Sequence, residues 1–287
     1  MKKKILIIGG CGYIGSRLIS FFDKKYFNIE VLDYEIDGDP IKINNYKTDF
    51  KNITINHLKR YDYIILLAAH SSVKSCNDDI DGAINNNIIN TKKLIDKIKK
   101  ISKINFIFAS SAAIYNGSNR PAEEKLKNKF IPNQLYDISK FYLENYIIKN
   151  LKKYYILRFS TVSGYSPNQN KFLILNKMHF DSLNNKIITV TNPSTKKSLL
   201  FIDDICRAII KIIKTKKKDK FGIYNLSSLN LKIGAIAKKV AHFHDAKIIY
   251  KQGRTHYSFY TSNKKFSKNF KFKFTKNIKS IIEGFYK

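Results

Sequence analysis

Residues 1–20 read MKKKILIIGGCGYIGSRLIS, in which a short apolar run leads into a group of glycines around Cys11. This stretch is compatible with an export signal or with a strand that leads into a phosphate-binding turn. An export signal needs an apolar core of roughly 7–15 residues. The uninterrupted apolar run here extends only from Ile5 to Ile8. The stretch therefore predicts a parallel strand buried on both faces, a glycine turn and a helix.

Each glycine of the turn has a separate task. Gly9 permits a tight turn after the strand, Gly12 lets a pyrophosphate approach the backbone, and Gly15 lets the helix pack on the sheet. The helix N-terminus then offers unpaired N–H groups to the phosphates. Asp33 ends the next predicted strand about 20 residues after the turn, where a ribose diol is bound. The acidic run Asp33–Glu35 would repel a 2′-phosphate, which favours NAD over NADP.

Strand and helix patterns alternate through the first half of the chain. This alternation predicts an α/β fold, a doubly wound (Rossmann) parallel sheet with helices on both faces. The regularity weakens after Thr161, which predicts a smaller mixed C-terminal substrate lobe. We expect an NAD-binding domain over 1–160 and a substrate-binding lobe over 161–287, from which some segments return to the first domain. The expected strands are 4–8, 29–33, 61–69, 104–111 and 154–160, and the expected helices are 17–25, 84–100 and 136–151.

Composition narrows the classes of partner. The 287 residues are 44% hydrophobic, which is enough for a core, and the net charge is +31. Such a charge attracts polyanions, but lysine is abundant in every predicted element and no nucleic-acid-binding signature accompanies it. We therefore expect a basic cleft for an anionic ligand and no specific nucleic acid. Three scattered cysteines and no apolar run near ~20 residues predict a cytoplasmic protein with no metal site and no membrane contact.

A second group of residues points to catalysis. Ser111 ends the fourth predicted strand, at the edge where such sheets bind ligands. Tyr136 and Lys140 are four residues apart, so they share a helix face. In a chain this rich in Tyr and Lys such a pair alone is usually a solvated surface, but its place after the glycine turn and Ser111 favours chemistry. An ammonium beside a phenol lowers the pKa of the phenol, which makes Tyr136 a candidate general acid and base for hydride transfer.

With these motifs in this order, the chain resembles the extended short-chain dehydrogenase/reductase family, and within it the nucleotide-sugar epimerases. The resemblance covers most of the chain and is strongest over 1–165. It implies a homodimer built on the helices near 84–100 and 136–151. It implies Ser111, Tyr136 and Lys140 as catalytic residues, and Ser111, Tyr136, Thr161, Lys197 and Lys251 as contacts of a nucleoside-diphosphate sugar. It places the NAD contacts at Gly9, Gly12, Tyr13, Ile14, Gly15, Asp33, Asp49, Phe50, Leu67, Ala68, Ala69, Asn87, Lys140 and Phe159.

Departures from the family pattern bear on the reaction. Family dehydratases carry Asp-Glu directly after the active-site Ser or Thr, whereas Ala112 and Ala113 stand here, which counts against 4,6-dehydration. Thr161 replaces an asparagine of the epimerases. Lys197 and Lys251 replace two arginines that hold the diphosphate, and lysine lacks their bidentate fork. An NAD-dependent epimerase that transiently oxidises C4 is favoured, while an NAD(P)H-dependent reductase of a 4-keto-6-deoxy sugar and a catalytically silent, dinucleotide-sensing nucleic-acid binder remain alternatives.

Overall fold

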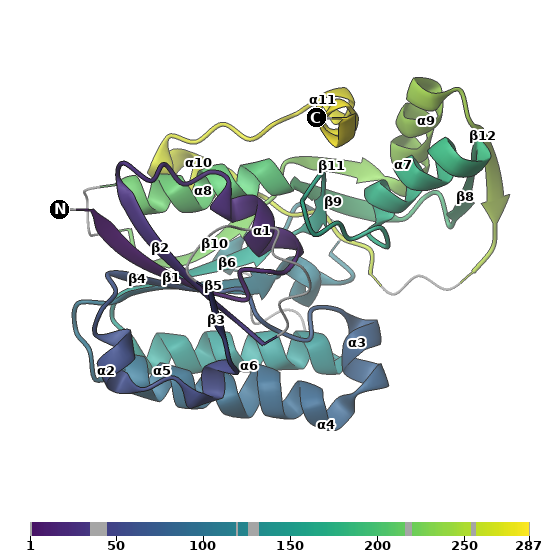
Figure 1. The fold of residues 1–287 in the computed structure, drawn as a ribbon. Coiled ribbons are helices and arrows are strands. Elements are labelled where there is room, and N and C mark those ends of the chain that lie inside the picture. The colour runs from purple at the N-terminus through teal and green to yellow at the C-terminus, as the bar shows by residue number, and fades with distance from the viewer. Residues whose placement is uncertain are drawn as a thin grey trace.

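The structure is a computed structural model that describes residues 2–34, 45–118, 120–125, 132–215, 220–253 and 257–286. Glu35, the last residue of the predicted acidic run, lies outside these ranges. Within them, seven parallel strands form a sheet in the order β3-β2-β1-β4-β5-β6-β10 (Figure 1). The strands are β1 (Lys3–Ile8), β2 (Phe27–Asp33), β3 (Asn45–Lys47), β4 (Tyr63–Leu66), β5 (Asn105–Ser111), β6 (Tyr154–Phe159) and β10 (Gly222–Leu226).

This strand order confirms the doubly wound prediction and fixes where a ligand can bind. The order reverses between β1 and β4, and ligands of such sheets bind beyond the carboxyl ends of the strands at that point. The glycine turn directly follows β1. The sequence motif and the topology therefore select the same place.

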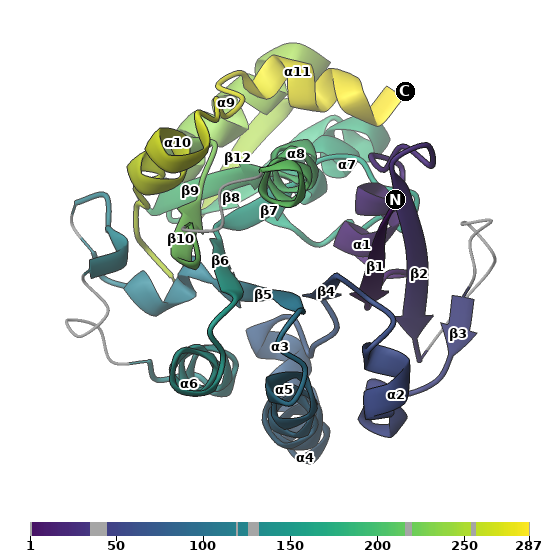
Figure 2. The ribbon, with the colours of Figure 1, turned by 90° about the vertical axis from the view of Figure 1, so that its left-hand side faces the viewer.

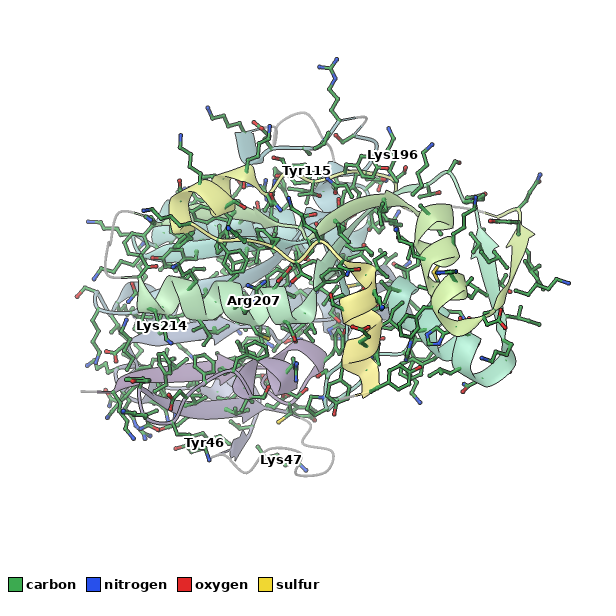
Figure 3. The ribbon with its side chains drawn as sticks, turned by 90° about the horizontal axis from the view of Figure 1, so that it is seen from above. Tyr46, Lys47, Tyr115, Lys196, Arg207 and Lys214 are labelled. Carbon is green, nitrogen blue, oxygen red and sulfur yellow. The ribbon has the colours of Figure 1, made fainter. Side chains whose placement is uncertain are left out.

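Helices cover both faces of the sheet (Figure 2). Along β1, Ile5 and Ile7 pack in one hydrophobic layer while Leu6 and Ile8 pack in the other, as expected for a strand buried on both faces. Arg207 and Lys214, both labelled in Figure 3, lie on the helix α8 (Ile202–Lys214). The layer of Ile5 and Ile7, the first layer, holds α1 (Tyr13–Ile19), α8 and α10 (Lys264–Phe270). The layer of Leu6 and Ile8, the second layer, holds α2 (Ile55–Leu58), α5 (Thr91–Lys99) and α6 (Leu135–Asn150).

Two of the expected helices differ from the observed ones. The helix expected over 17–25 begins at Tyr13, because Gly12 is still extended and caps it, and ends at Ile19. The Ser20 hydroxyl then donates to the carbonyl oxygen of Arg17 at 2.7 Å, which ends the turn locally. The helix expected over 84–100 has a π-helical first half, η2 (Ile84–Asn90), before α5. It is preceded by α3 (Val73–Asp78) and α4 (Ile80–Ala83).

The segments after residue 160 are shared between two places. The helix α8 packs against α1, α10 packs against β10, and β10 is an edge strand of the large sheet, so all three belong to the first sheet and its layers. The remaining segments form the smaller mixed lobe, in which β9 pairs with β7 in parallel and with β11 antiparallel. The division at residue 160 remains a prediction. The lobe contains β7 (Thr161–Ser163), β8 (Ile187–Thr191), β9 (Lys196–Phe201), β11 (Leu229–Lys232), β12 (Lys247–Lys251), α7 (Ile174–Asn185), α9 (Ile233–His244) and α11 (Ile278–Glu283).

Candidate active site

A cavity of about 1390 Å³ begins at the glycine turn and extends to the lobe. Its walls include most of the residues that the sequence predicts for cofactor, substrate and catalysis, although they come from segments far apart in the chain. Asn87 and Lys251 are absent from its lining. The predicted residues that do line it are Gly9, Gly12, Tyr13, Ile14, Gly15, Asp33, Asp49, Phe50, Leu67, Ala68, Ala69, Ser111, Tyr136, Lys140, Phe159, Thr161 and Lys197.

The glycine turn leaves room for a dinucleotide. Gly9 has a φ of 83°, and a Cβ there would lie 2.4 Å from the backbone nitrogen of Ala68, so only glycine fits. A Cβ on Gly12 would meet no protein atom closer than 3.6 Å. Because Gly12 also lines the cavity, its backbone is open to the approach of a phosphate group.

Asp33 is held at the edge of the same cavity by backbone donors. Its Oδ2 accepts from the N–H of Cys11 at 2.8 Å, and its Oδ1 accepts from the N–H of Tyr34 at 2.9 Å. These bonds fix the carboxylate one strand away from the turn, where the ribose of a dinucleotide is recognised. The open glycine backbone and the fixed carboxylate together fit NAD. The backbone of Gly12 would contact its phosphates, and Asp33 would contact its ribose.

Ser111, Tyr136 and Lys140 meet where β5 ends and α6 begins. Ser111 is the last residue of β5, and its Oγ accepts from the N–H of Ala113 at 3.1 Å. The half-buried Tyr136 lies in the first turn of α6. Burial raises the pKa of Tyr136 to about 12, and a hydrogen bond with Ser111 partly opposes this. The phenol is therefore protonated at neutral pH in this structure.

The prediction that Lys140 lowers the pKa of Tyr136 is wrong for this structure. The Lys140 ammonium donates to the carbonyl oxygen of Ala109 at 2.9 Å, and it lies 5.0 Å from the ring centroid of Phe108. Burial lowers the pKa of Lys140 to about 8, with Cys76 acting in the opposite direction. The ammonium is thus turned toward the backbone of β5, and the phenol keeps the raised pKa that burial gives it.

A buried network that sequence reasoning missed lies behind the end of β5, where it includes Ser110, the neighbour of Ser111. Arg158 and Glu144 are both almost fully buried and form a forked pair, with Nε to Oε1 at 2.9 Å and Nη2 to Oε2 at 2.5 Å. The Ser110 hydroxyl donates to Oε1 of Glu144 at 2.5 Å. Arg158 also donates to the hydroxyl of Tyr115. The network ties α6 to β5 and β6; its signal in the sequence was a glutamate four residues after Lys140, on the buried face of the helix.

The end of the cavity toward the lobe is formed by single side chains. Thr161 and Lys197 line it, and burial lowers the pKa of Lys197 to about 8, with no carboxylate within the described ranges to offset this. Its ammonium lies 5.9 Å from the ring centroid of Tyr257, a lining residue that the sequence did not reveal. The Tyr257 hydroxyl donates to Oδ2 of Asp137 at 2.7 Å. Lys251 is exposed on β12 instead.

Comparison with known proteins identifies the family. Residues 5–227, well over half of the chain, match the profile described as the NAD dependent epimerase/dehydratase family. The chain belongs to this family.

Two relatives and one solved structure illustrate the range of the epimerase/dehydratase family. A UDP-glucose 4-epimerase of Mycoplasma genitalium is 28% identical, with 98% of this chain and 94% of that protein covered. A dTDP-D-glucose 4,6-dehydratase of Dictyostelium discoideum is also 28% identical, but the match covers 79% of this chain and only 58% of that protein. The UDP-glucuronic acid 4-epimerase of Bacillus cereus, solved with UDP-glucuronic acid and NAD, has a TM-score of 0.85 at 21% identity and covers 99% of this chain and 98% of its own.

Membership of the epimerase/dehydratase family confirms three predictions: the resemblance itself, the assignment as an enzyme, and NAD as the cofactor. The roles of the individual site residues remain predictions. Within the described ranges, no helix is long and apolar enough to cross a lipid bilayer.

For Asn87, the structure gives a different role from the predicted contact with the cofactor phosphates. Asn87 is buried; its Oδ1 accepts from the N–H of His70 at 2.8 Å, and its Nδ2 donates to the carbonyl oxygen of the same residue at 3.1 Å. It therefore holds the loop after β4. The neighbouring Asn85, Asn86 and Asn90 of the π-helical segment line the cavity instead. The run of asparagines was visible in the sequence, but which of them faces the cavity depends on the wider turn of the π-helix.

Proposed function

We propose that this member of the family is a nucleotide-sugar 4-epimerase that oxidises C4 of a nucleoside-diphosphate sugar and reduces it again from the other face. The observation that carries the proposal is a single cavity in which Ser111, Tyr136 and Lys140 meet between the glycine turn and Lys197. The dinucleotide and the diphosphate of a sugar nucleotide can thus approach the same phenol from opposite ends.

Bound NAD supplies the hydride acceptor and adds a positive charge to the cavity. A positive charge beside a buried phenol lowers the pKa of the phenol, so bound NAD would lower the raised pKa of Tyr136. The Tyr136 oxygen then takes the proton of the C4 hydroxyl and later returns it. Ser111 shares its hydrogen bond between Tyr136 and that hydroxyl. Lys140 bonds to the backbone of β5 at Ala109, two residues before Ser111, and Lys197 neutralises the diphosphate.

The residues after Ser111 support epimerisation over dehydration. Dehydration needs side chains that remove a proton beside the ketone and expel water. Ala112 is fully buried and Ala113 lines the cavity, and neither can exchange a proton. The second candidate is the reductase of a nucleoside-diphosphate 4-keto-6-deoxy sugar, because the same serine and tyrosine can protonate a carbonyl.

The test is to incubate the purified protein with UDP-, GDP-, CDP- and dTDP-sugars and to identify products by NMR. We expect inversion at C4 of at least one sugar without net consumption of NAD. Consumption of one NADH per sugar converted would replace the epimerase with the reductase. Failure to convert any sugar, with or without added NADH or NADPH, would refute both.

We also propose that the protein is a homodimer that pairs through η2 and α6. Ile89 on η2 and Ile138 and Tyr142 on α6 are exposed by 39%, 44% and 42%, which is unusual for large apolar side chains on neighbouring helices. Light scattering should give twice the mass of 33.4 kDa. The variant Ile138→Lys should shift the protein to monomer, and a monomeric wild type would exclude this interface.

A further inference from the structure

Asp137 is a buried acid that the proposed chemistry does not use. It directly follows Tyr136 on α6 and is only 2% exposed. Its Oδ2 accepts the hydrogen bond from Tyr257, while within the described ranges its Oδ1 has no hydrogen-bond partner. A buried carboxylate with an unsatisfied oxygen is costly to the fold. Such a group is expected where it serves a ligand.

The charge of Asp137 determines whether the Tyr257 hydroxyl can donate or accept a further hydrogen bond. Burial raises the pKa of Asp137 to about 6, and the bond from Tyr257 lowers it in part. The other titratable groups that sense this carboxyl are Tyr136 and Cys76. At neutral pH Asp137 is therefore mainly ionised, and an ionised carboxylate can only accept. The single proton of the Tyr257 hydroxyl is then engaged, so its oxygen can only accept a further hydrogen bond.

Tyr257 is held firmly on the substrate side of the cavity. The segment that follows it bonds to both lobes: the N–H of Phe259 donates to the carbonyl of Lys196 at 3.2 Å, and the N–H of Ala122 donates to the carbonyl of Tyr260 at 2.9 Å. The ring itself lies beside Lys197 and lines the cavity. A phenol fixed in this way is suited to recognise one group of a ligand.

We propose that Tyr257 accepts a hydrogen bond from a hydroxyl of the substrate sugar, and that Asp137 is a positioning residue that makes Tyr257 an acceptor. This inference rests on the proposed function and adds to it the recognition of the sugar by a free hydroxyl on the lobe side. Lys197 remains available for the diphosphate. The pair links α6, which carries Tyr136, to the segment that closes the substrate side, so sugar recognition and catalysis share one helix.

The kinetic test uses whichever sugar nucleotide the wild type converts. Tyr257→Phe should raise KM about tenfold, the worth of one hydrogen bond, with kcat nearly unchanged. Asp137→Ala should raise KM similarly, whereas Asp137→Asn, whose amide oxygen still accepts from Tyr257, should stay near wild type. The double variant Tyr257→Phe with Asp137→Ala should be no worse than either single one. Tyr260→Phe, outside the cavity lining, is the matched control.

Deoxy analogues of the same sugar nucleotide identify the hydroxyl. Removal of the hydroxyl that Tyr257 contacts should weaken binding to the wild type but not to Tyr257→Phe, whereas removal of any other hydroxyl should affect both proteins equally. The inference is wrong if KM of Tyr257→Phe equals that of the wild type, or if no analogue distinguishes the two proteins.

A readout that needs no turnover separates this inference from the proposed function. Carbon-13 NMR of the Asp137 carboxyl, assigned with Asp137→Asn, should titrate near pH 6 and should move to higher pH in Tyr257→Phe, which loses the bond that favours the ionised form. Calorimetry with UDP-glucose and the other sugar nucleotides should show weaker binding to Tyr257→Phe. If the wild type binds a sugar nucleotide without converting it, and Tyr257→Phe binds it more weakly, only the epimerase proposal is refuted. If conversion and binding are the same in Tyr257→Phe as in the wild type, only the inference is refuted. A wild type that neither converts nor binds any of these compounds would refute both.

Discussion

The two ends of the cavity are built in different ways. The glycine wall, residues 9–15, is one continuous stretch that runs from the turn after β1 into the start of α1. The lobe wall, Thr161, Lys197 and Tyr257, consists of side chains from three segments that are far apart in the chain. Backbone recognition depends on the path of the chain, so few residues can change there. A wall of separate side chains can change its ligand by single substitutions while the fold persists.

The largest effect is expected where the two walls meet. Tyr136→Phe removes the oxygen that we propose as the acid and base, so kcat should fall by about 10²–10⁴-fold. NAD affinity, measured by fluorescence, and the thermal midpoint should remain near wild type. The exposed Tyr142→Phe on the same helix serves as the control. Turnover within a few-fold of wild type would exclude Tyr136 as the acid and base.

Two alanine variants separate the roles within the glycine wall. Gly9→Ala forces a non-glycine residue to a φ of 83° and against Ala68, so the free energy of unfolding should fall by about 2 kcal/mol or more. Gly12→Ala meets no close protein atom, so denaturant midpoints should stay near wild type while NAD binding weakens. Equal losses of stability in both variants would contradict the assignment of Gly12 to phosphate binding.

Lysine variants test whether the lobe wall binds the diphosphate. Lys197→Met should raise KM for the sugar nucleotide about tenfold, and Lys251→Met, on the exposed strand β12, should not change it. Because the pKa of Lys197 is lowered to about 8, it carries its charge below that pH and loses it above. The wild-type kcat/KM should therefore fall as pH rises through 8, and the fall should be shallower in Lys197→Met, where Lys140, whose pKa is also lowered to about 8, still loses its charge. An effect of Lys251 as large as that of Lys197 would contradict the geometry.

The smallest effect is expected from acid, which should loosen the lobe before the glycine wall. Nδ1 of His179 lies 3.0 Å from Nε2 of His244 in the lobe, and burial lowers the pKa of His179 to about 4, below its unfolded value of about 6.5. A lowered pKa means that the stabilisation is complete above pH 6.5 and is lost as pH falls toward 4. The thermal midpoint should decline over that window, and less steeply in His179→Phe. If the thermal midpoint of His179→Phe declined as steeply as that of the wild type, groups other than His179 would cause the acid sensitivity.

The sequence predicted the fold and most of the cavity lining, but it failed at particular residues. It placed the glycine turn, Ser111, Tyr136 and Lys140 in one cavity because each follows a local signal: a strand end or a helical spacing. It treated Lys197 and Lys251 alike, since both are lysines in a basic lobe, and only one of them lines the cavity. It assigned Asn87 to the cofactor, although the π-helical turn buries it against His70.

What the sequence alone determined is the alternation of strands and helices, the phosphate turn and the Tyr-x-x-x-Lys pair, because backbone periodicity and steric limits act over a few residues. Tertiary structure alone decided the partner of Asp137, which is 120 residues away in the chain. It also decided the direction of the Lys140 ammonium and the raised pKa of Tyr136. These depend on which groups lose contact with water when the lobe packs on the sheet, and burial of this kind is a property of the assembled fold.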